Sequence, residues 1–269
     1  MAGSEMGIAG KVAVVTGGSS GIGRAVAVAL VERGVRVVVV GLTQARVSAV
    51  AGALRARSAD PGDVLPLTLD VRSESDMEQM AHSVLSRFGR IDLLVAAAGV
   101  ARRPGSQRLV PYPAAQLPID EWDAILDTNL RGTFLADRAV LPTMQARGSG
   151  TIVNVSSSPG GYRGQAFAAP YCASKFGVRG LTQSLAEEVR RLGIKVHCIL
   201  PDAIDTPLLD RSTLAARLGT PLAPERVAEL VVSLWTEPQD SQNVEPVLLP
   251  ARRPAALDLR RDAGWEWKR

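Results

Sequence analysis

The chain of 269 residues has little of what small cross-linked or metal-stabilised proteins depend on. It has only two cysteines, Cys172 and Cys198, and neither belongs to a CxxC pair. A disulfide framework or a structural zinc site is therefore not expected. The two histidines, His82 and His197, also lack a ligand spacing such as HExxH. We expect free core thiols and no metal site.

Long hydrophobic segments are missing as well. No apolar run approaches the roughly 18 residues that a membrane-spanning helix needs. The N-terminus lacks the basic and then apolar pattern of a signal sequence. These absences favour a cytoplasmic protein without a membrane partner.

The chain has little net charge outside its last residues. The formal net charge is +4 and the pI is about 9.4. Residues 251–269 carry six cations and three anions, so +3 of this charge lies in a basic C-terminal tail. The remaining 250 residues sum to only +1, and a nucleic-acid partner is not expected.

What the sequence does contain is an alternation of short apolar runs with segments of helical period. The candidate strands cover residues 12–15, 36–40, 64–69, 93–97, 151–155, 195–200 and 244–249. They are almost entirely apolar, which is typical of strands covered on both faces. Between the first two, Ile22, Val26 and Leu30 recur every four residues, and Gly34 ends this helix. Further helices are predicted near residues 75–88, 120–146, 171–191 and 224–236.

This alternation predicts an α/β fold with a Rossmann-type, doubly wound parallel sheet of about seven strands. We expect one domain over residues 1–250, followed by the tail 251–269. Two stretches interrupt the alternation, residues 100–118 and 204–223. Long loops beyond the carboxyl ends of parallel strands hold ligands, so 204–223 is expected to be a substrate loop.

A glycine-rich turn follows the first candidate strand. Gly17, Gly21 and Gly23 allow a tight turn and a close approach of the backbone to a pyrophosphate. The helix that follows supplies N–H donors and partial positive charge at its N-terminus. Together they predict a dinucleotide-binding loop.

A second signal is the pair Tyr171 and Lys175, four residues apart at the start of a candidate helix. Residues at this spacing share one helix face. A lysine ammonium near the phenol favours the phenolate, so we expect the pKa of Tyr171 to move down toward neutrality. A phenol tuned in this way is a useful general acid or base.

The TGxxxGxG spacing together with YxxxK resembles the short-chain dehydrogenase/reductase family, in its single-domain branch, over about residues 8–250. The resemblance implies a catalytic set of Asn129, Ser157, Tyr171 and Lys175, with Asn129 anchoring a water that relays protons to Lys175. It also implies homotetramers or dimers built on the helices near 120–146 and 171–191. The implied cofactor-binding residues are Gly17, Ser19, Ser20, Gly21, Ile22, Gly23, Asp70, Val71, Ala98, Gly99, Tyr171, Lys175, Pro201 and Thr206.

The chain departs from the family at two places. Ala96-Ala97-Ala98-Gly99 replaces the family's NNAG, which removes two asparagine side chains. Asp202 replaces the glycine that follows Pro201, and its carboxylate either faces the site or faces solvent.

The position of the catalytic serine is ambiguous. The strand pattern favours Ser157, whereas the usual spacing of thirteen residues before Tyr171 gives Ser158. We expect Ser157, because sheet register fixes a strand end while the loop after it tolerates an insertion.

Cofactor choice is determined at the end of the second strand. Members that prefer NAD have an acidic residue there for the ribose 2′-hydroxyl. The sequence has Leu42 and Thr43 instead, with Arg24 and Arg46 nearby, each either a phosphate ligand or a surface charge. NADP is favoured over NAD.

The resemblance implies an NAD(P)-dependent oxidoreductase that interconverts a ketone or aldehyde and an alcohol. Imine reduction is an alternative, and so is an inactive NAD(P)-binding regulatory or structural protein. An epimerase or dehydratase fits poorly. The expected pocket wall includes loop 100–118, with Arg102, Arg103 and Arg108. Its other expected residues are Pro159, Gly160, Gly161, Tyr162, Phe167, Leu208 and Leu209. Its apolar character suggests a partly hydrophobic small-molecule substrate.

Overall fold

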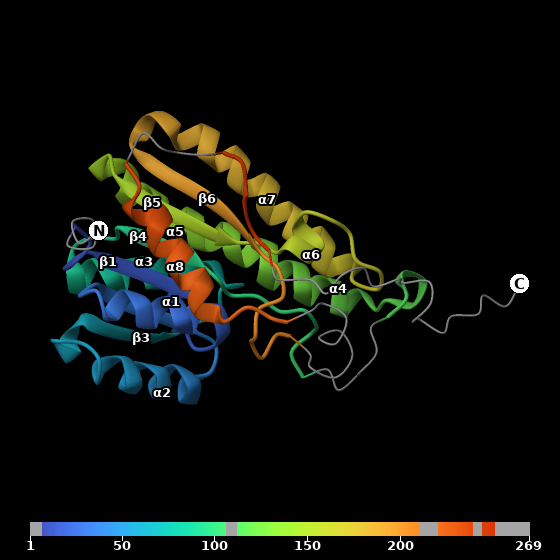
Figure 1. Ribbon diagram of the computed structural model, residues 1–269, viewed down its shortest axis with the longest axis horizontal. Coiled ribbons are helices and arrows are strands. Elements are labelled where there is room, and N and C mark those ends of the chain that lie inside the picture. Colours follow the sequence, from blue (N-terminus) through green and yellow to red (C-terminus); the bar gives the residue numbers. More distant parts are fainter. Residues whose placement is uncertain (1–6, 106–111, 210–219, 239–243, 251–269) are drawn as a thin grey trace, which may run out of the picture.

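The computed structural model describes residues 7–105, 112–209, 220–238 and 244–250. Its centre is one seven-stranded sheet in which every neighbouring pair of strands is parallel. The strands are β1 (Val12–Thr16), β2 (Arg36–Gly41), β3 (Val64–Thr68), β4 (Leu93–Ala96), β5 (Gly150–Val155), β6 (Ile194–Pro201) and β7 (Val247–Leu249). Their order across the sheet is β3-β2-β1-β4-β5-β6-β7, which confirms the predicted doubly wound α/β fold (Figure 1).

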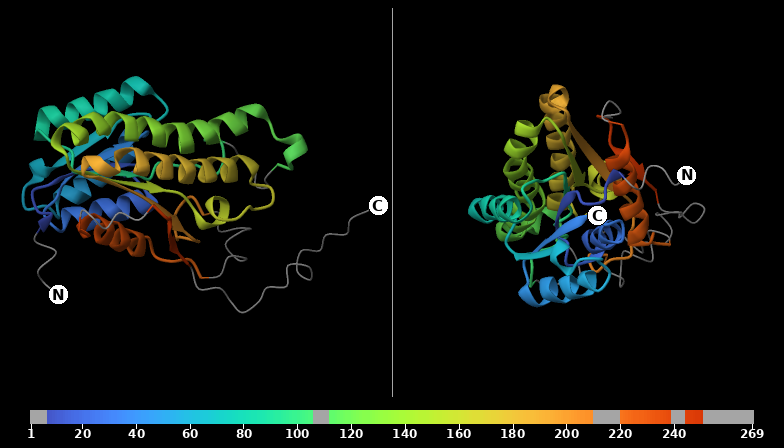
Figure 2. Two further views of the ribbon diagram at one scale, coloured as in Figure 1. Left: turned by 90° about the horizontal axis from the view of Figure 1, so that it is seen from above. Right: turned by 90° about the vertical axis from the view of Figure 1, so that its left-hand side faces the viewer.

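Helices cover both faces of this sheet, as the end-on view in Figure 2 shows. They are α1 (Gly21–Val31), α2 (Gln44–Arg55), α3 (Glu74–Phe88), α4 (Ile119–Leu126), α5 (Gly132–Arg147), α6 (Ser158–Gly161), α7 (Ala169–Val189) and α8 (Pro224–Thr236). The apolar residues of α1, α2 and α8 pack on one face, and those of α3, α5 and α7 on the other. No helix in the described ranges is both long and apolar enough to span a bilayer.

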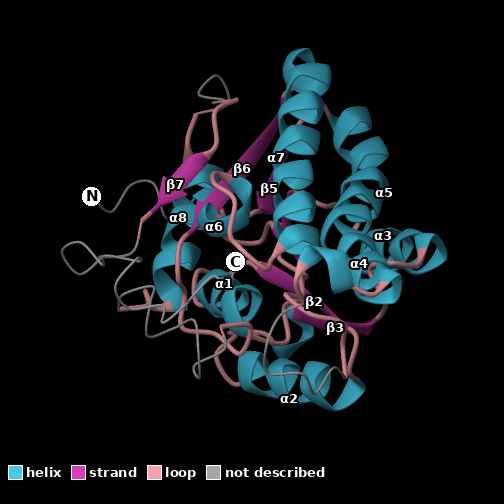
Figure 3. Ribbon diagram, turned by 90° about the vertical axis from the view of Figure 1, so that its right-hand side faces the viewer, coloured by secondary structure: helices cyan, strands magenta, loops and turns pink. Residues whose placement is uncertain are grey.

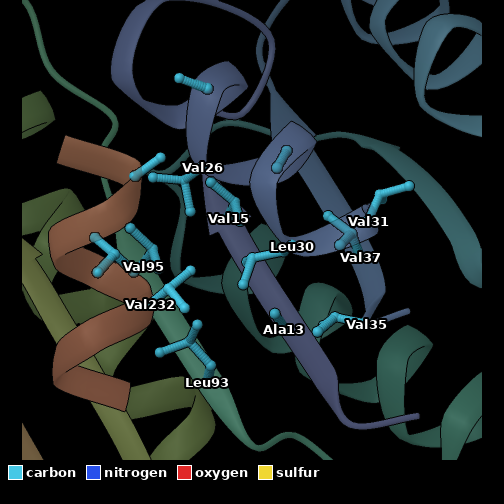
Figure 4. Packing of buried hydrophobic residues seen from close by; sticks show 14 of the residues in the cluster. Ala13, Val15, Val26, Leu30, Val31, Val35, Val37, Leu93, Val95 and Val232 are labelled. Carbon is cyan, nitrogen blue, oxygen red and sulfur yellow. The ribbon is translucent and has the colours of Figure 1, made fainter. Parts of the chain in front are cut away.

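The all-apolar strands follow from this double cover. Consecutive residues of a strand point to opposite faces. Val15 accordingly belongs to the apolar cluster of Leu30 and Val232, part of which Figure 4 shows, while Val14 belongs to the cluster of Met80 on the other face. Val232 is 8% exposed, and the other four side chains are fully buried.

Helix α2 and the single-turn helix α6 were not predicted from the sequence. Helix α2 buries Val47, Val50, Ala51 and Leu54, at the spacing i, i+3, i+4 and i+7 of an apolar helix face. Alanine, serine and glycine dilute this stripe, so the segment has little hydrophobic contrast between its faces. The pattern was nevertheless present in the sequence.

The predicted helix 120–146 is not continuous. It divides into α4 and α5, joined by a π-helical turn, η4 (Asp127–Arg131). Such turns insert one residue into a helix and are frequent at functional sites. Strand β7 is also shorter than predicted, because residues 244–246 lie outside it.

The site is determined by the strand order. The chain moves outward from β1 to β2 and β3, then returns to place β4 on the other side of β1. Ligands bind in such sheets outside the carboxyl ends of the strands at this switch. That end of the molecule, which also contains α4 and α6, faces the viewer in Figure 3.

Candidate active site

Ser157, Tyr171 and Lys175 meet at the carboxyl end of β5. The Ser157 hydroxyl lies close enough to the Tyr171 phenol to lower its pKa. Lys175 lies one turn after Tyr171 on α7, and its Nζ is 5.9 Å from the centre of the Tyr171 ring. The same Nζ donates to the carbonyl oxygen of Val155 at 2.8 Å. All three side chains line one cavity.

The neighbouring serines have other environments. Ser156 is buried and its Oγ donates to the carbonyl oxygen of Lys175 at 2.8 Å, which ties β5 to α7. Ser158 begins α6, and among the described residues the cavity wall includes Ser157 but not Ser158. The hydroxyl beside Tyr171 is therefore that of Ser157.

Asn129 is fully buried in the π-helical turn, and protein groups occupy its amide. Its Nδ2 donates to the carbonyl oxygen of Val100 at 2.9 Å and to Oγ of Ser174 at 3.0 Å. Its Oδ1 accepts from the N–H of Val100 at 2.7 Å. The amide therefore fixes the loop after β4 and, through Ser174, helix α7.

These contacts define the role of the Asn129 side chain in the structure. Its side chain is a positioning group, whereas the anchoring of a water by this residue stays a prediction. Sequence reasoning missed Ser174, because a lone serine in a helix carries no signal.

Burial is the main influence on the pKa values of Tyr171 and Lys175. It raises the pKa of Tyr171, and the nearby Ser157 hydroxyl only partly offsets this. Burial also lowers the pKa of Lys175 to about 8. The expected downward shift of the Tyr171 pKa is thus wrong in direction for the protein alone. The reason is that desolvation of the phenolate is the largest influence, while the Lys175 ammonium is directed to the Val155 carbonyl.

The glycine turn between β1 and α1 has the predicted geometry. Gly17 and Gly21 have φ values of 66° and 48°, a region that side chains disfavour. A Cβ on Gly17 would lie 2.8 Å from the carbonyl oxygen of Ala97, so the turn packs directly on the β4 loop. Helix α1 begins at Gly21 with no side-chain cap from Ser20 and no acidic residue in its first turn. Its free N–H groups fit a pyrophosphate.

The other predicted cofactor residues divide into two groups. Those that line the cavity are Ile22, Gly99, Tyr171, Lys175, Pro201 and Thr206. Those outside its wall are Gly17, Ser19, Ser20, Gly21, Gly23, Asp70, Val71 and Ala98. The two groups join where Thr206 touches the glycine turn, since a Cβ on Gly21 would lie 3.1 Å from Thr206 Cγ2.

Asp70, the predicted adenine contact, forms an ion pair with Arg72. Its Oδ2 is 2.6 Å from Arg72 Nη2, and Oδ1 accepts from the Arg72 backbone N–H at 3.0 Å. The hydrogen bond from this guanidinium lowers the pKa of Asp70. Val71 is buried next to the π-helical turn, where a Cβ on Gly132 would lie 2.7 Å from its Cγ2.

The end of β2 presents no carboxylate. Leu42 is 58% exposed and Thr43 precedes α2 as its N-cap residue. Arg24 and Arg46 are both exposed near this end. The surface at the end of β2 is therefore compatible with a negatively charged ligand group as well as with a ligand hydroxyl group.

The cavity has a volume of about 240 Å³. Loop 100–118 contributes Ala101, Arg102, Tyr112 and Leu117 to its wall, as predicted. Of the seven wall residues predicted outside this loop, four line the cavity: Pro159, Phe167, Leu208 and Leu209. Gly160, Gly161 and Tyr162 do not, and the Tyr162 side chain is 56% exposed. Glu121 and Gln165 are polar wall residues that the sequence did not single out.

The arginines predicted near the cavity have different positions. Arg102 lines it, whereas Arg103 pairs with Asp120 at 3.1 Å and with Glu121 at 3.8 Å. Arg108, residues 210–219 of the substrate loop and the tail 251–269 lie outside the described residues.

Asp202 is 9% exposed and belongs to the cavity wall, so it is not a residue of the solvent-exposed surface. Its carboxyl group stands where the family has a glycine without a side chain. Within the described ranges no group of histidine, cysteine and carboxylate side chains could hold a metal ion.

The sequence profile of the short chain dehydrogenase family matches residues 11–216. The chain belongs to this family, and it is an oxidoreductase of the short-chain dehydrogenase/reductase type. Among curated relatives, an uncharacterized oxidoreductase of Staphylococcus haemolyticus is 33% identical over 85% of this chain and 92% of its own. A 3-oxoacyl-acyl-carrier-protein reductase of Thermotoga maritima is 32% identical over 86% of this chain and 93% of its own.

Comparison with solved structures gives the same family. Levodione reductase superposes with a TM-score of 0.81 at 30% identity, over 90% of this chain and 97% of its own. A metagenomic short-chain oxidoreductase in complex with NADP gives a TM-score of 0.75 at 32% identity, over 91% and 99% of the two chains. The likeness to both therefore extends over nearly the whole chain and not over the glycine turn alone.

Proposed function

We propose that this protein is an NAD(P)-dependent oxidoreductase that interconverts a ketone or aldehyde with the corresponding alcohol. The observation that carries the proposal is that Ser157, Tyr171 and Lys175 line one cavity, which reaches the glycine turn at Ile22 and Thr206. A carbonyl oxygen held by the Ser157 and Tyr171 hydroxyls would have its carbon within the same cavity.

In the direction of reduction, a dinucleotide held at the glycine turn would supply a hydride, that is two electrons and one hydrogen nucleus, for the carbonyl carbon. The C=O π bond breaks and its electron pair moves to oxygen. Tyr171 donates its Oη proton to that oxygen and regains a proton from solvent. Ser157 donates a hydrogen bond that orients the carbonyl. The net change is one carbonyl, one hydride and one proton converted to one alcohol.

In the protein alone the phenol of Tyr171 is protonated at neutral pH, which is the form that donates a proton during reduction. Lys175 supplies a cation beside the phenolate that forms when the proton leaves, and it would hold the nicotinamide ribose. Asn129 keeps Val100 and Ser174 in place around them. Tyr171 is thus the proton donor, Lys175 the cation and Asn129 the positioning residue.

Tyr171→Phe tests the assignment directly. Turnover with reduced cofactor and a panel of ketones and aldehydes should fall at least about 100-fold, the usual contribution of a general acid. Cofactor binding, followed by fluorescence titration, should remain within a fewfold of wild type. An active phenylalanine variant would refute the mechanism.

The same assay with Ser157→Ala and with Ser158→Ala tests which of the two serines is catalytic. The first should lose turnover and the second should not, since only Ser157 lies beside Tyr171 in the cavity wall of the described residues. The opposite result would move the catalytic role to Ser158.

We further propose that NADP is the preferred dinucleotide. The absence of a carboxylate at Leu42 and Thr43 and the exposed guanidinium groups of Arg24 and Arg46 support this preference. Dissociation constants for NADPH and NADH, measured with wild type and with Arg24→Ala and Arg46→Ala, test it. A tighter complex with NADH would reverse the choice.

An inactive nucleotide-binding protein is the second candidate, and the altered segment 96–99 favours it. Tight binding of NADPH without turnover on ketones, aldehydes and cyclic imines would support it. Turnover of imines alone would assign imine reduction instead. The intact set of Asn129, Ser157, Tyr171 and Lys175 supports the enzyme.

A homo-oligomer, a tetramer or a dimer, is also proposed. Phe134 on α5 and Phe176 on α7 are 44% and 42% exposed on the same side of the sheet. Exposed aromatics of this size favour a second copy as their cover. Sedimentation of wild type and of Phe134→Ser should show a loss of the larger species in the variant.

A further inference from the structure

Asp202 stands directly after β6, at the level of the catalytic residues. The register pairs Val155 with Ile199, so Ser157 and Pro201 are level with each other and Asp202 is one residue further. Its backbone N–H donates to the carbonyl oxygen of Leu249 at 3.0 Å, which continues the bonding between β6 and β7. The sheet therefore holds this carboxylate in place at the edge of the cavity.

The cavity determines where the reacting end of a dinucleotide lies. Its pyrophosphate would rest at the glycine turn, and its ring must reach a carbon whose oxygen is held by Ser157 and Tyr171. The wall at these two places includes Ile22, residues 201–204 and Thr206. Thr206 touches the glycine turn at one end of the segment 201–206, and Asp202 lies near the other.

The four charged side chains of the cavity wall in the described residues are Arg102, Glu121, Lys175 and Asp202. Glu121 is partnered, since its Oε1 accepts from the N–H of Arg103 at 2.9 Å and the Arg103 guanidinium is 3.8 Å away. The Nζ of Lys175 is bound to the last residue of β5. Asp202 is the carboxylate of the wall segment that would lie beside the nicotinamide ring.

We propose that Asp202 stabilises the oxidised, positively charged nicotinamide over the reduced, neutral one. The ring gains one unit of positive charge when it gives up its hydride, whereas the rest of the dinucleotide is unchanged. A carboxylate in a water-poor cavity interacts with that charge more strongly than one in bulk water. The bound reduced form is thereby a stronger hydride donor, and Asp202 acts as a positioned charge that favours carbonyl reduction on the protein.

This inference rests on the proposed function, and a thermodynamic cycle separates the two. The change in the reduction potential on binding is determined by the ratio of the dissociation constants of the reduced and oxidised forms. Titrations of wild type with NADPH and with NADP⁺ give this ratio without turnover. If neither form binds, the proposed function fails; if both bind, the role of Asp202 can be judged alone.

Asp202→Asn keeps the shape of the side chain and removes its charge. The ratio of the dissociation constant of NADPH to that of NADP⁺ should fall at least about tenfold, because a charge pair a few ångströms apart would give about fivefold even in bulk water and interacts more strongly in a water-poor cavity. Asp202→Gly, which restores the family's residue, provides a second neutral variant should the first fail to fold. Asp202→Glu should retain most of the wild-type ratio.

Asp205→Asn is the matched control, because Asp205 lies on the same segment, is exposed and is not among the described residues of the cavity wall. It should leave the ratio unchanged, and so should added salt in the wild type, since a buried charge is weakly screened. A ratio within twofold of wild type in the neutral Asp202 variants overturns the inference. An equal change in Asp205→Asn, or an equal loss of affinity for both cofactor forms, overturns it as well.

Discussion

The Nζ of Lys175 lies 2.8 Å from the carbonyl oxygen of Val155, which joins the catalytic face of α7 to the last residue of β5. This bond holds a cation in a buried position where its pKa is about 8. The folded protein therefore gives up the Lys175 proton more readily than the unfolded chain does. Between pH 8 and the ordinary lysine pKa of 10.5, the free energy of unfolding should rise with pH on this account.

Lys175→Met should abolish activity and increase the free energy of unfolding. Removing the buried ammonium gains about 3 kcal/mol below pH 8, and losing the hydrogen bond costs about 1 kcal/mol. The variant should thus be about 2 kcal/mol more stable at pH 7, with the gain vanishing by pH 10, and it should not turn over. Urea unfolding at both pH values measures this, and an equal gain at pH 7 and pH 10 would contradict the assignment.

Asn129→Leu should destabilise the site itself. It leaves the N–H and the carbonyl of Val100 without their partner, at about 1–3 kcal/mol for each buried group. We expect a loss of about 3 kcal/mol in unfolding free energy, together with reduced kcat/KM. Ser174→Ala is the control, because it removes the 3.0 Å bond from Asn129 and the 2.8 Å bond from Ser174 Oγ to the Tyr171 carbonyl oxygen, but leaves those to Val100. Equal effects of the two substitutions would rule out the role of the Val100 loop.

The strands and most helices could be predicted from the sequence because a doubly covered sheet leaves a simple pattern. Val14 and Val15 are both buried although they face opposite ways, and only a parallel sheet between helices requires this. Helix α2 was missed because its stripe contains small residues. The π-helical turn could not be predicted, since one inserted residue at Asn129 changes no apolar period.

Within the site, motif spacing brought Tyr171, Lys175 and Ser157 together correctly in space, but it could not give their electrostatics. The direction of the Tyr171 pKa depends on how much water the fold removes, and no local pattern contains that quantity. Part of the cavity wall was not predicted, because it comes from residues outside the motifs. Glu121 reaches the cavity from a segment distant in sequence from Tyr171.

Asp137 should make the protein less stable as pH rises. It is buried on α5, and desolvation raises its pKa to about 7 although Asn154 Nδ2 donates to it at 2.9 Å. The folded state therefore keeps a proton that the unfolded chain loses from about pH 4 upward. Asp137→Asn should remove this slope and gain up to about 4 kcal/mol at pH 8, with little gain at pH 4. Denaturant titrations at the two pH values check this, and a variant that loses stability at pH 8 would contradict it.

His197 should have the opposite effect. It is 1% exposed on β6, neither ring nitrogen has a hydrogen-bond partner among the described residues, and burial lowers its pKa to about 4. Between pH 6.5 and pH 4 the unfolded chain binds a proton that the folded state refuses, so stability falls as pH falls, by about 3 kcal/mol in total. Across that window the slopes of Asp137 and His197 oppose each other, and wild type should show a nearly flat profile.

His197→Leu should make the pH dependence of stability that Asp137 causes measurable. Without the imidazole, the remaining slope of Asp137 should make the variant more stable at about pH 5 than at about pH 7.5, and the lost desolvation cost should raise its stability above wild type at both. The exposed His82 gives the matched control, since His82→Gln should leave the profile unchanged. Chemical unfolding followed by circular dichroism measures the profiles. If His197→Leu retains a flat profile, His197 does not titrate between the folded and unfolded states as its burial requires.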